Sequence, residues 1–284
     1  MRAALHTLMF GGYPLERVAP VASDIGYTGV ALMCRPPHLD LDNPGPSGGA
    51  GARILTDAGL QVVGLASGLG RPESFTGAPA ESELDGVRRA LEAANILGAG
   101  LLRLWGGADG MSVDNDDELS AAAAWYGQAA ALAAAAGIRV TIEVHSQGLA
   151  SSTSATCRLV DAIDHPNLGA ALDTGNLHAA ATTVGADDVT ELGARIFDVH
   201  VKDMRGLPHA EGHTLEVDGR HYVHVPLGEG DVRNGETLGQ LAAGGYTGWI
   251  ANESECAWPD WDTSVAAARH EYAELDRLIR AAHA

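Results

Sequence analysis

The feature that most constrains the fold is an alternation along the chain, in which short apolar runs are followed by helical segments rich in Ala and Leu. Strands that alternate with helices in this way indicate a parallel sheet built from βαβ units. The expected strands are Ala3–Met9, Gly29–Cys34, Gln61–Ala66, Gly100–Trp105, Arg139–His145, Gly169–Asp173, Ile196–Lys202 and Trp249–Asn252. The expected helices are Pro14–Asp24, Ala50–Asp57, Ser82–Leu97, Asp116–Ala136, Ser152–Ile163, Val189–Ala194, Glu236–Ala243 and Thr263–Ala282.

Eight such units in 284 residues match the size of a closed (β/α)₈ barrel, the TIM barrel. The alternative is a doubly wound open sheet, which normally carries a Gly-rich phosphate-binding turn after its first strand. Phe10-Gly11-Gly12-Tyr13 is too weak a match to that turn. No linker, low-complexity segment or internal repeat divides the chain, so we predict a single α/β domain, a TIM barrel over residues 1–284.

A different pattern lies between the seventh and eighth expected strands. The segment His209–Val225 contains Asp218-Gly219, a pair typical of a two-residue hairpin turn, between alternating residues. We therefore predict a β-hairpin insertion after strand seven that shapes or covers the pocket. The segment also contains four histidines, which are His209, His213, His221 and His224. Their number suggests a second metal site, but we interpret them as solvent-facing residues of the hairpin.

The charge of the chain excludes several classes of partner. Lys and Arg total 18 against 37 Asp and Glu, which gives a formal net charge of −19. Because no segment concentrates Lys or Arg, the chain repels nucleic-acid phosphates and anionic membrane surfaces. We therefore expect a small-molecule, carbohydrate-like substrate and neither a nucleic acid nor a membrane as partner. The sequence indicates no oligomeric state, so a homo-oligomer stays open.

The cysteines and the N-terminal residues indicate the cellular compartment of the protein. Cys34, Cys157 and Cys256 are too few and too widely spaced for a disulfide framework or a zinc ribbon. The first residues lack the sustained apolar stretch of a signal peptide, and no apolar run is long enough to span a membrane as a helix. These features predict a cytoplasmic protein.

Polar side chains stand at the ends of the last four expected strands, and these residues are Glu143, Asp173, His200 and Glu253. In a TIM barrel the carboxyl ends of the strands meet at one mouth, where three carboxylates would repel one another. A divalent cation removes that repulsion, and three oxygen ligands with one imidazole suit Mn²⁺, Mg²⁺, Co²⁺ or Zn²⁺. We therefore predict one mononuclear metal site. The alternative is a set of separate salt bridges, for example to Arg103 and Lys202.

Two further residues share a strand face with a predicted ligand. His145 follows Glu143 by two residues and Lys202 follows His200 by two, and side chains two apart on a strand point the same way. His145 is a candidate for substrate contact or proton transfer. Lys202 is a candidate for stabilising an enolate oxygen or for pairing with a site carboxylate. The predicted catalytic residues are thus Glu143, Glu253, His145 and Lys202.

Four other residues are candidate substrate contacts. Arg103 and Trp105 end the fourth expected strand, where they would line the mouth, although Arg103 is equally suited to be a buried counter-charge. His6 lies near the end of the first strand, and a core histidine with satisfied hydrogen bonds is as good an explanation for it. His178 follows Asp173 by five residues, and a structural role in the loop is its alternative.

The motifs that carry these residues resemble those of the sugar phosphate isomerase/epimerase-like, or xylose isomerase-like, TIM-barrel superfamily. The resemblance covers nearly the whole chain and is strongest from Ile138 to Glu253, through TIEVH, HPNLGAALDTGNLH, VHVKD, VPLGEGDV and GGYTGWIANE. In that superfamily the Glu of the first motif, the Asp of the second, the His of the third and the last Glu of the fifth bind the metal. The resemblance therefore implies the same four ligands. It also implies a substrate-side role for His178.

The resemblance implies enolisation chemistry, with Mn²⁺ the first expectation for the metal. The predicted function is an isomerase or epimerase of a non-phosphorylated keto-sugar or polyol-like hydroxy-ketone, acting by enediolate-type proton transfer. A phosphate is not expected because the loop LGEGD carries Glu229 and Asp231 where a barrel phosphate site needs amides and positive charge. A large glycoside and a cyclic keto acid also stay open.

Other functions fit the same fold. A dehydratase similar to inosose or dehydroshikimate dehydratases is the main alternative, and the sequence does not decide between dehydration and isomerisation. A DNA-repair nuclease resembling endonuclease IV is disfavoured by the net charge of −19 and by the single histidine among the four ligands. A metal-free relative is disfavoured because all four ligand types are present.

Overall fold

The computed structural model describes residues 1–180 and 186–283 and forms a closed barrel of eight parallel strands. The strands follow the order β1-β11-β7-β6-β5-β4-β3-β2 around the barrel. Their bounds are β1 Arg2–His6, β2 Gly29–Met33, β3 Gln61–Ala66, β4 Leu101–Leu104, β5 Arg139–Glu143, β6 Leu168–Asp173, β7 Ile196–Val201 and β11 Trp249–Asn252. The predicted TIM barrel is confirmed.

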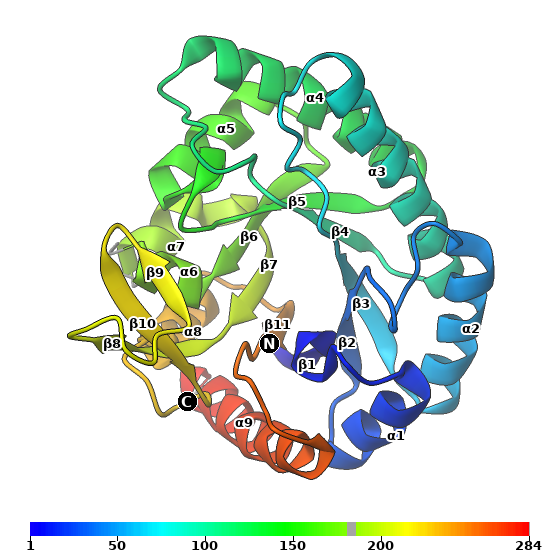
Figure 1. Ribbon diagram of the computed structural model, residues 1–284, viewed down its shortest axis with the longest axis vertical. Coiled ribbons are helices and arrows are strands. Elements are labelled where there is room, and N and C mark those ends of the chain that lie inside the picture. The colour runs from blue at the N-terminus through cyan, green and yellow to red at the C-terminus, as the bar shows by residue number, and fades with distance from the viewer. Residues whose placement is uncertain (181–185, 284) are drawn as a thin grey trace.

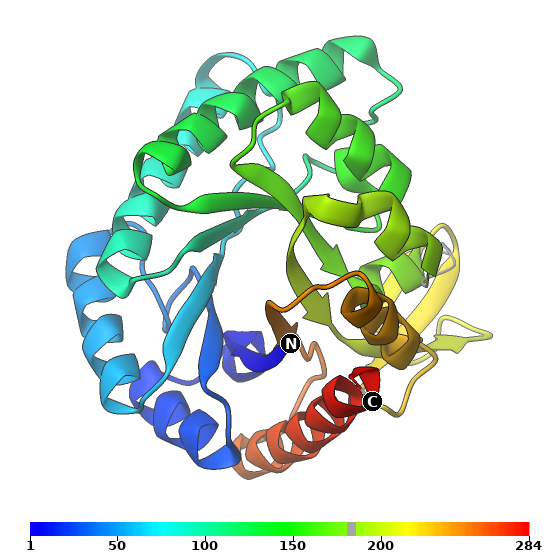
Figure 2. The same ribbon diagram turned by 180° about the vertical axis from the view of Figure 1, so that it is seen from behind.

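Helices form a ring outside the strands (Figures 1 and 2). The bounds of the α-helices are α1 Leu15–Ile25, α2 Pro44–Asp57, α3 Gly77–Leu97, α4 Asp116–Ala135, α5 Thr153–Ile163, α6 Thr174–Ala179, α7 Ala186–Leu192, α8 Asn234–Ala243 and α9 Trp261–Ala282. Short 3₁₀ helices occupy Thr7–Phe10, Gly148–Ala150 and Gly193–Arg195. Among the described helices, none combines the length and apolar character needed to cross a bilayer.

Capping side chains set where several helices begin. The Asn115 side chain accepts hydrogen bonds from two backbone amides at the start of α4, and Ser152 and Asp260 cap α5 and α9 in the same way. Such caps satisfy amides that have no partner within the helix. These three caps fix the residues at which α4, α5 and α9 begin, and so they fix the ends of the loops that lead into these helices.

Several element boundaries differ from the prediction. The first strand ends at His6, because the His6 ring accepts a hydrogen bond from the Leu8 amide and turns the chain into a 3₁₀ helix. Helix α2 begins earlier than the expected Ala50, at Pro44, and its first turns are rich in Gly. Helix α3 likewise begins at Gly77. The short helix α6 was not predicted, and Asp173 caps it by accepting from the Asn176 amide.

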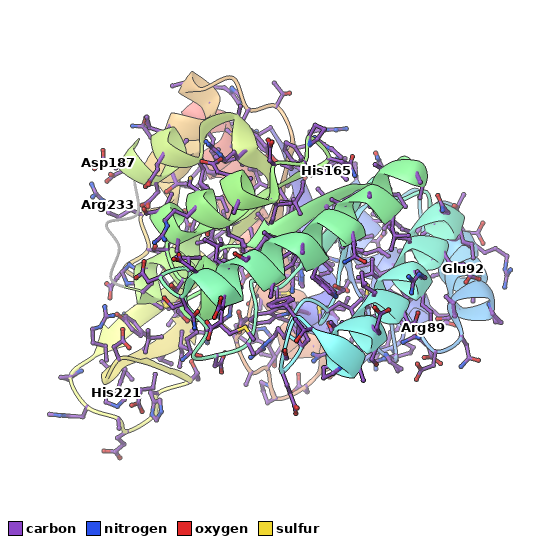
Figure 3. The ribbon with its side chains drawn as sticks, turned by 90° about the horizontal axis from the view of Figure 1, so that it is seen from above. Arg89, Glu92, His165, Asp187, His221 and Arg233 are labelled. Atoms are coloured by element: carbon purple, nitrogen blue, oxygen red, sulfur yellow. The ribbon has the colours of Figure 1, made fainter. Side chains whose placement is uncertain are left out.

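The predicted hairpin insertion is present and belongs to a three-stranded antiparallel sheet. Its strands are β8 Asp203–Leu207, β9 Leu215–Val217 and β10 Arg220–Val225, in the order β8-β10-β9. The turn between β9 and β10 holds Asp218 and Gly219 at φ 51° and φ 74°, the left-handed region that a two-residue hairpin turn requires. The sheet projects from the barrel where His221 is labelled (Figure 3). Strand β8 was not expected, because it begins at Asp203, directly after barrel strand β7 ends at Val201.

A buried carboxyl behind the last barrel strand couples the fold to pH. Glu271 of α9 is 1% exposed and accepts hydrogen bonds from Asn252 Nδ2 at 2.7 Å and Ser254 Oγ at 2.9 Å. Burial raises the pKa of Glu271 to about 7, against the lowering effect of these hydrogen bonds. The folded chain therefore keeps a proton on Glu271 that the unfolded chain releases above its ordinary pKa of 4.5.

We expect this proton to lower the stability of the fold as the pH rises. Because the folded pKa is the higher one, the free energy of unfolding falls between the unfolded and folded pKa values, by about 3 kcal/mol in total. Glu271→Gln cannot titrate and should lose this part of the pH dependence. Urea unfolding at about pH 5 and about pH 8 measures it. An equal fall in the wild-type and E271Q proteins would contradict the assignment.

Candidate metal centre

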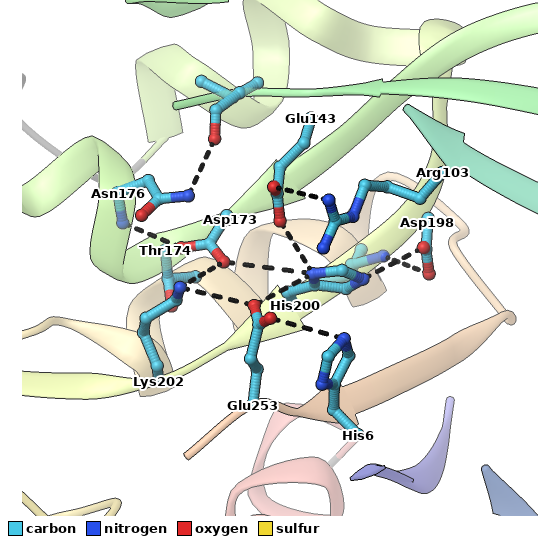
Figure 4. A network of polar contacts seen from close by, with 12 residues as sticks. His6, Arg103, Glu143, Asp173, Thr174, Asn176, Asp198, His200, Lys202 and Glu253 are labelled. Carbon is cyan, nitrogen blue, oxygen red and sulfur yellow. Dashed lines mark hydrogen bonds and ion pairs between the residues drawn. The ribbon is translucent and has the colours of Figure 1, made fainter. Parts of the chain in front are cut away.

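Four buried side chains converge at the carboxyl ends of neighbouring strands. Glu143 ends β5, Asp173 ends β6, His200 lies in β7 and Glu253 follows β11 directly. The strand register pairs Asp173 with His200, and His200 with Ala251 of β11. One ligand atom from each of the four lies within 4.8 Å of the others. Figure 4 shows these side chains pointing toward one another, as the sequence predicted.

The two ring nitrogens of His200 face different groups. Nδ1 lies 3.0 Å from Glu143 Oε1, 3.2 Å from Glu253 Oε2 and 4.0 Å from Asp173 Oδ2. Nε2 lies 3.1 Å from Asp198 Oδ2. A carboxylate accepts hydrogen bonds, so Nε2 carries a proton and donates it to Asp198, and Nδ1 is the nitrogen that faces the other carboxylates. Burial opposes protonation of the ring, but Asp198 and Glu253 raise the pKa of His200 well above its ordinary value, so without a metal ion Nδ1 also carries a proton and donates it to the carboxylates.

Asp198 is a functional candidate that the sequence reasoning missed. The signal was available, because Asp198 precedes His200 by two residues in the same strand and shares its face. A carboxylate that holds the second nitrogen of a histidine ligand fixes its tautomer and orientation. The structure therefore extends the predicted quartet by a positioning residue.

We expect Asp198→Ala to weaken Mn²⁺ binding by about 10- to 100-fold, because the His200 ring loses the acceptor that orients it. Isothermal titration of metal-free protein with MnCl₂ measures the affinity. Asp161→Ala is the matched control, since Asp161 is exposed and pairs only with Arg195 on the surface. Equal Mn²⁺ affinities in the D198A and D161A proteins would rule out the positioning role.

Arg103 holds Glu143 from the barrel interior. Its Nη1 donates to the Ser67 carbonyl at 2.8 Å and lies 3.6 Å from Glu143 Oε2. Burial alone would raise the pKa of Glu143, but Arg103 and the His200 hydrogen bond outweigh it and lower the pKa to about 2. Glu143 is therefore an ionised carboxylate at neutral pH. This contact matches the counter-charge role considered for Arg103.

The chain's only lysine lies against the carboxylates. Lys202 Nζ is 3.2 Å from Asp173 Oδ2 and 3.3 Å from Glu253 Oε2, and it also donates to Glu255. Its stem crosses Gly175 at a position that leaves no room for a Cβ. Burial would lower the pKa of Lys202, but Asp173 and Glu253 raise it well above its ordinary value. The charged ammonium group thus compensates part of the negative charge of the quartet.

Glu253 is also held on its other side. His6 Nε2 lies 3.3 Å from Glu253 Oε1, and burial lowers the pKa of His6 to about 4, so this ring is neutral at neutral pH. Burial alone would raise the pKa of Glu253, but His6, Lys202 and His200 lower it well below its ordinary value. His6 lies behind the carboxylate, at the end of the first strand as predicted.

Asp173 provides the test of whether this donor set fits a metal ion. Its Oδ2 is fully buried, makes no hydrogen bond and has only ion-pair contacts with Lys202 and His200. Burial raises the pKa of Asp173 to about 8 in spite of Lys202. The Lys202 ammonium therefore does not fully compensate a negative charge on this oxygen, and a divalent cation bound to it would favour the ionised carboxylate. Three carboxylates and one oriented imidazole therefore fit a divalent cation.

A cavity of about 430 Å³ opens directly above the quartet. Its wall includes six of the predicted residues, which are Arg103, Trp105, Glu143, His145, Lys202 and Glu253. Asn176 also lines it and donates from Nδ2 to the Val144 carbonyl at 3.2 Å. The volume is in the range of small-molecule sites.

The two remaining histidines lie in different surroundings. The His145 ring lies 4.3 Å from the Trp105 ring, and burial lowers the pKa of His145 to about 4, so a neutral imidazole faces the cavity. The His178 ring lies 5.8 Å from the Tyr222 ring of β10. His178 is not among the described residues that line the cavity, and its ring packs instead against the projecting sheet.

Comparisons with solved structures support the fold. A probable 3-DHS dehydratase, AsbF, from Bacillus anthracis matches with a TM-score of 0.77 at 18% identity, covering 97% of this chain and 99% of that chain. An L-ribulose 3-epimerase matches with a TM-score of 0.77 at 19% identity, covering 99% and 95%. The IOLI protein with a binding zinc atom matches with a TM-score of 0.78 at 14% identity, covering 98% of both chains.

No curated protein sequence matches the chain. At the identities of the solved structures, their likeness shows a shared fold, and it leaves activity undetermined. The family assignment rests on a sequence model, described as xylose isomerase-like TIM barrel, which matches residues 19–278. Because that match spans most of the 284 residues, the chain belongs to the xylose isomerase-like TIM-barrel family.

Proposed function

We propose that this chain is a divalent-metal-dependent isomerase or epimerase of a non-phosphorylated keto-sugar or polyol-like hydroxy-ketone. The observation that carries the proposal is the convergence of four buried ligand atoms within 4.8 Å, beside a cavity that two of the four residues, Glu143 and Glu253, also line. Glu143, Asp173, His200 and Glu253 would hold the ion, with Mn²⁺ expected first and Mg²⁺, Co²⁺ and Zn²⁺ as alternatives. The bound cation would polarise the substrate carbonyl and lower the cost of an enediolate.

Glu143 and Glu253 are the proton-transfer groups in this proposal. Glu143 ends β5 and Glu253 follows β11, two strands that are separated in the barrel by β6 and β7, and both carboxylates line the cavity. A substrate in the cavity would therefore be in reach of both carboxylates. Their pKa values lie below the ordinary range, so both are ionised and able to accept a proton at neutral pH. One would take the proton next to the carbonyl, and the other would return a proton to the opposite face or the neighbouring carbon.

The loop after β10 supports a non-phosphorylated substrate. The Asp203 carboxylate accepts the backbone amides of Gly228 at 2.9 Å, Gly230 at 3.1 Å and Val232 at 3.1 Å. In many TIM barrels, loops at this end of the barrel offer such amides to a phosphate. Here the Asp203 carboxylate already accepts hydrogen bonds from these amides.

A dehydratase is the second candidate, and Lys202 favours it. The charged Lys202 ammonium lines the cavity wall, as does His145, whose ring is neutral. Lys202 would deliver a proton to a hydroxyl that leaves from the carbon beyond the enolate. The solved neighbour described as a probable 3-DHS dehydratase supports testing this outcome.

The experiment is a substrate screen in D₂O with Mn²⁺ added, covering ketohexoses, inososes, dehydroshikimate and keto-glycosides. Solvent deuterium in a recovered substrate or its isomer, without loss of water, would support isomerisation or epimerisation. Loss of water would select the dehydratase. If no compound exchanges deuterium or loses water with any of the four metals, the proposed chemistry is wrong.

A further inference from the structure

Two arginines at the mouth of the cavity have no role in the chemistry described above. We infer that Arg35 and Arg71 bind a carboxylate group at the end of the substrate that lies away from the metal centre, so that the substrate is an acidic hydroxy-ketone. The inference rests on the proposed function only in placing the reacting carbonyl of the substrate at the quartet. It deepens that function by naming the substrate's charge and the residues that recognise it.

Arg35 is a cation of the cavity wall without an anionic partner. It follows β2 and lines the cavity, and its guanidinium makes no hydrogen bond or ion pair with any residue in the described part of the chain. A Cβ at Gly11 would lie 3.3 Å from Arg35 Nη2, so the guanidinium lies close against the backbone there. In a chain with 37 acidic and 18 basic residues, an arginine left unpaired beside a cavity is available to a ligand.

Arg71 is held in place by an aromatic ring. It follows β3, and its guanidinium carbon lies 4.3 Å from the centroid of the Trp105 ring. One nitrogen donates to Asp109 at 3.1 Å in a pair that is solvent-exposed on both sides. A guanidinium has five N–H donors, so this weak pair leaves donors free. Stacking on Trp105 reduces the entropy that the side chain would lose on binding an anion.

The other two cations of the cavity wall are already engaged. Arg103 contacts Glu143, and Lys202 contacts Asp173 and Glu253. Arg35 and Arg71 are therefore the cations of the described cavity wall that remain for a substrate anion. The cavity wall therefore has two kinds of cation. Arg103 and Lys202 pair with the carboxylates of the proposed metal site, and Arg35 and Arg71 remain at the mouth.

The barrel order places these two ends across from each other. In the closed order of eight strands, β2 lies opposite β6 and β3 lies opposite β7. Asp173 and His200 belong to β6 and β7, whereas Arg35 and Arg71 follow β2 and β3. A substrate whose carbonyl lies at the quartet therefore extends across the mouth toward the two guanidinium groups. A planar carboxylate matches the paired N–H donors of such a group, which a neutral hydroxymethyl group cannot do.

A matched series of ketoses tests the inference. D-Fructose, D-fructuronate and D-fructose 6-phosphate share the carbonyl end and carry a hydroxymethyl, a carboxylate or a phosphate at the other end. Isothermal titration of each into the Mn²⁺-loaded protein should show D-fructuronate binding about 10-fold tighter than D-fructose, with the advantage falling as salt is added. Arg35→Met and Arg71→Met should each reduce this ratio of D-fructuronate to D-fructose affinity.

Arg17→Met is the matched control. Arg17 is also exposed and stacks on a tryptophan, with its guanidinium carbon 4.0 Å from the Trp261 ring, but it is not part of the described cavity wall. The R17M protein should keep the full D-fructuronate preference. The inference is overturned if D-fructuronate binds no tighter than D-fructose or does not bind, if D-fructose 6-phosphate is preferred, or if the preference survives both cavity substitutions.

The binding measurement separates this inference from the proposed function. A carboxylate preference that depends on Arg35 and Arg71 would stand even if no compound exchanged deuterium. Conversely, deuterium exchange on neutral ketoses without any carboxylate preference would support the proposed function and overturn the anion site.

Discussion

Replacing Glu253 with glutamine is expected to slow deuterium exchange of the substrate by about 100- to 10,000-fold. The amide cannot accept a proton, and it removes one of the negative charges that would hold the cation. Glu253 is 3% exposed, lines the cavity and lies 3.2 Å from His200 Nδ1, so the substitution acts within the quartet itself. Exchange is followed by mass spectrometry on the substrate identified in the screen, and bound metal is measured in the same samples.

Glu216→Gln is the control for this substitution, because Glu216 is an exposed carboxylate on β9 of the projecting sheet. The E216Q protein should keep wild-type exchange and metal content. An E253Q protein that retained both would exclude Glu253 from the metal site and from proton transfer.

Replacing Lys202 with methionine is expected to lower the free energy of unfolding of the metal-free protein by about 3–5 kcal/mol. The change leaves the ionised Glu253 carboxylate, and the Asp173 carboxyl group beside it, without the ammonium group that lies 3.3 Å and 3.2 Å from them. A divalent cation binds the folded state and supplies positive charge to the same oxygens, so added Mn²⁺ should stabilise the K202M protein strongly. Urea unfolding in EDTA and in excess Mn²⁺ measures both effects.

Arg195→Met provides the comparison for Lys202→Met. Arg195 pairs with Asp161 at 2.6 Å on the surface, where removing a cation should cost no more than about 1 kcal/mol. Equal losses of stability in the K202M and R195M proteins would show that Lys202 does not compensate the buried carboxylates.

The barrel itself was predictable because its signal is local and repeated. Each strand is a short apolar run and each helix has its own start and stop residues, so eight independent patterns pointed to one architecture. The boundaries were less predictable where one contact decides them. Strand β1 stops at His6 because its ring accepts the Leu8 amide, and α6 begins because Asp173 accepts the Asn176 amide.

The quartet was predictable for a related reason. Strand ends in a closed parallel barrel meet at one mouth, so polar residues at those ends come together whatever the loops do. The structure brings all four ligand atoms within 4.8 Å, while their binding of a metal stays a prediction. His178 was harder to place, because its position depends on the short helix α6 and on packing against Tyr222 of the projecting sheet.

The sequence by itself determined the barrel, the projecting hairpin and the meeting of four polar residues at the strand ends of one mouth, because strand periodicity and strand order alone place them. Only the tertiary structure decided how their charge is balanced. Lys202 contacts Asp173 and Glu253, and Arg103 contacts Glu143. These contacts join residues from separate strands and loops, and their distances depend on how the whole barrel closes, which no local pattern encodes.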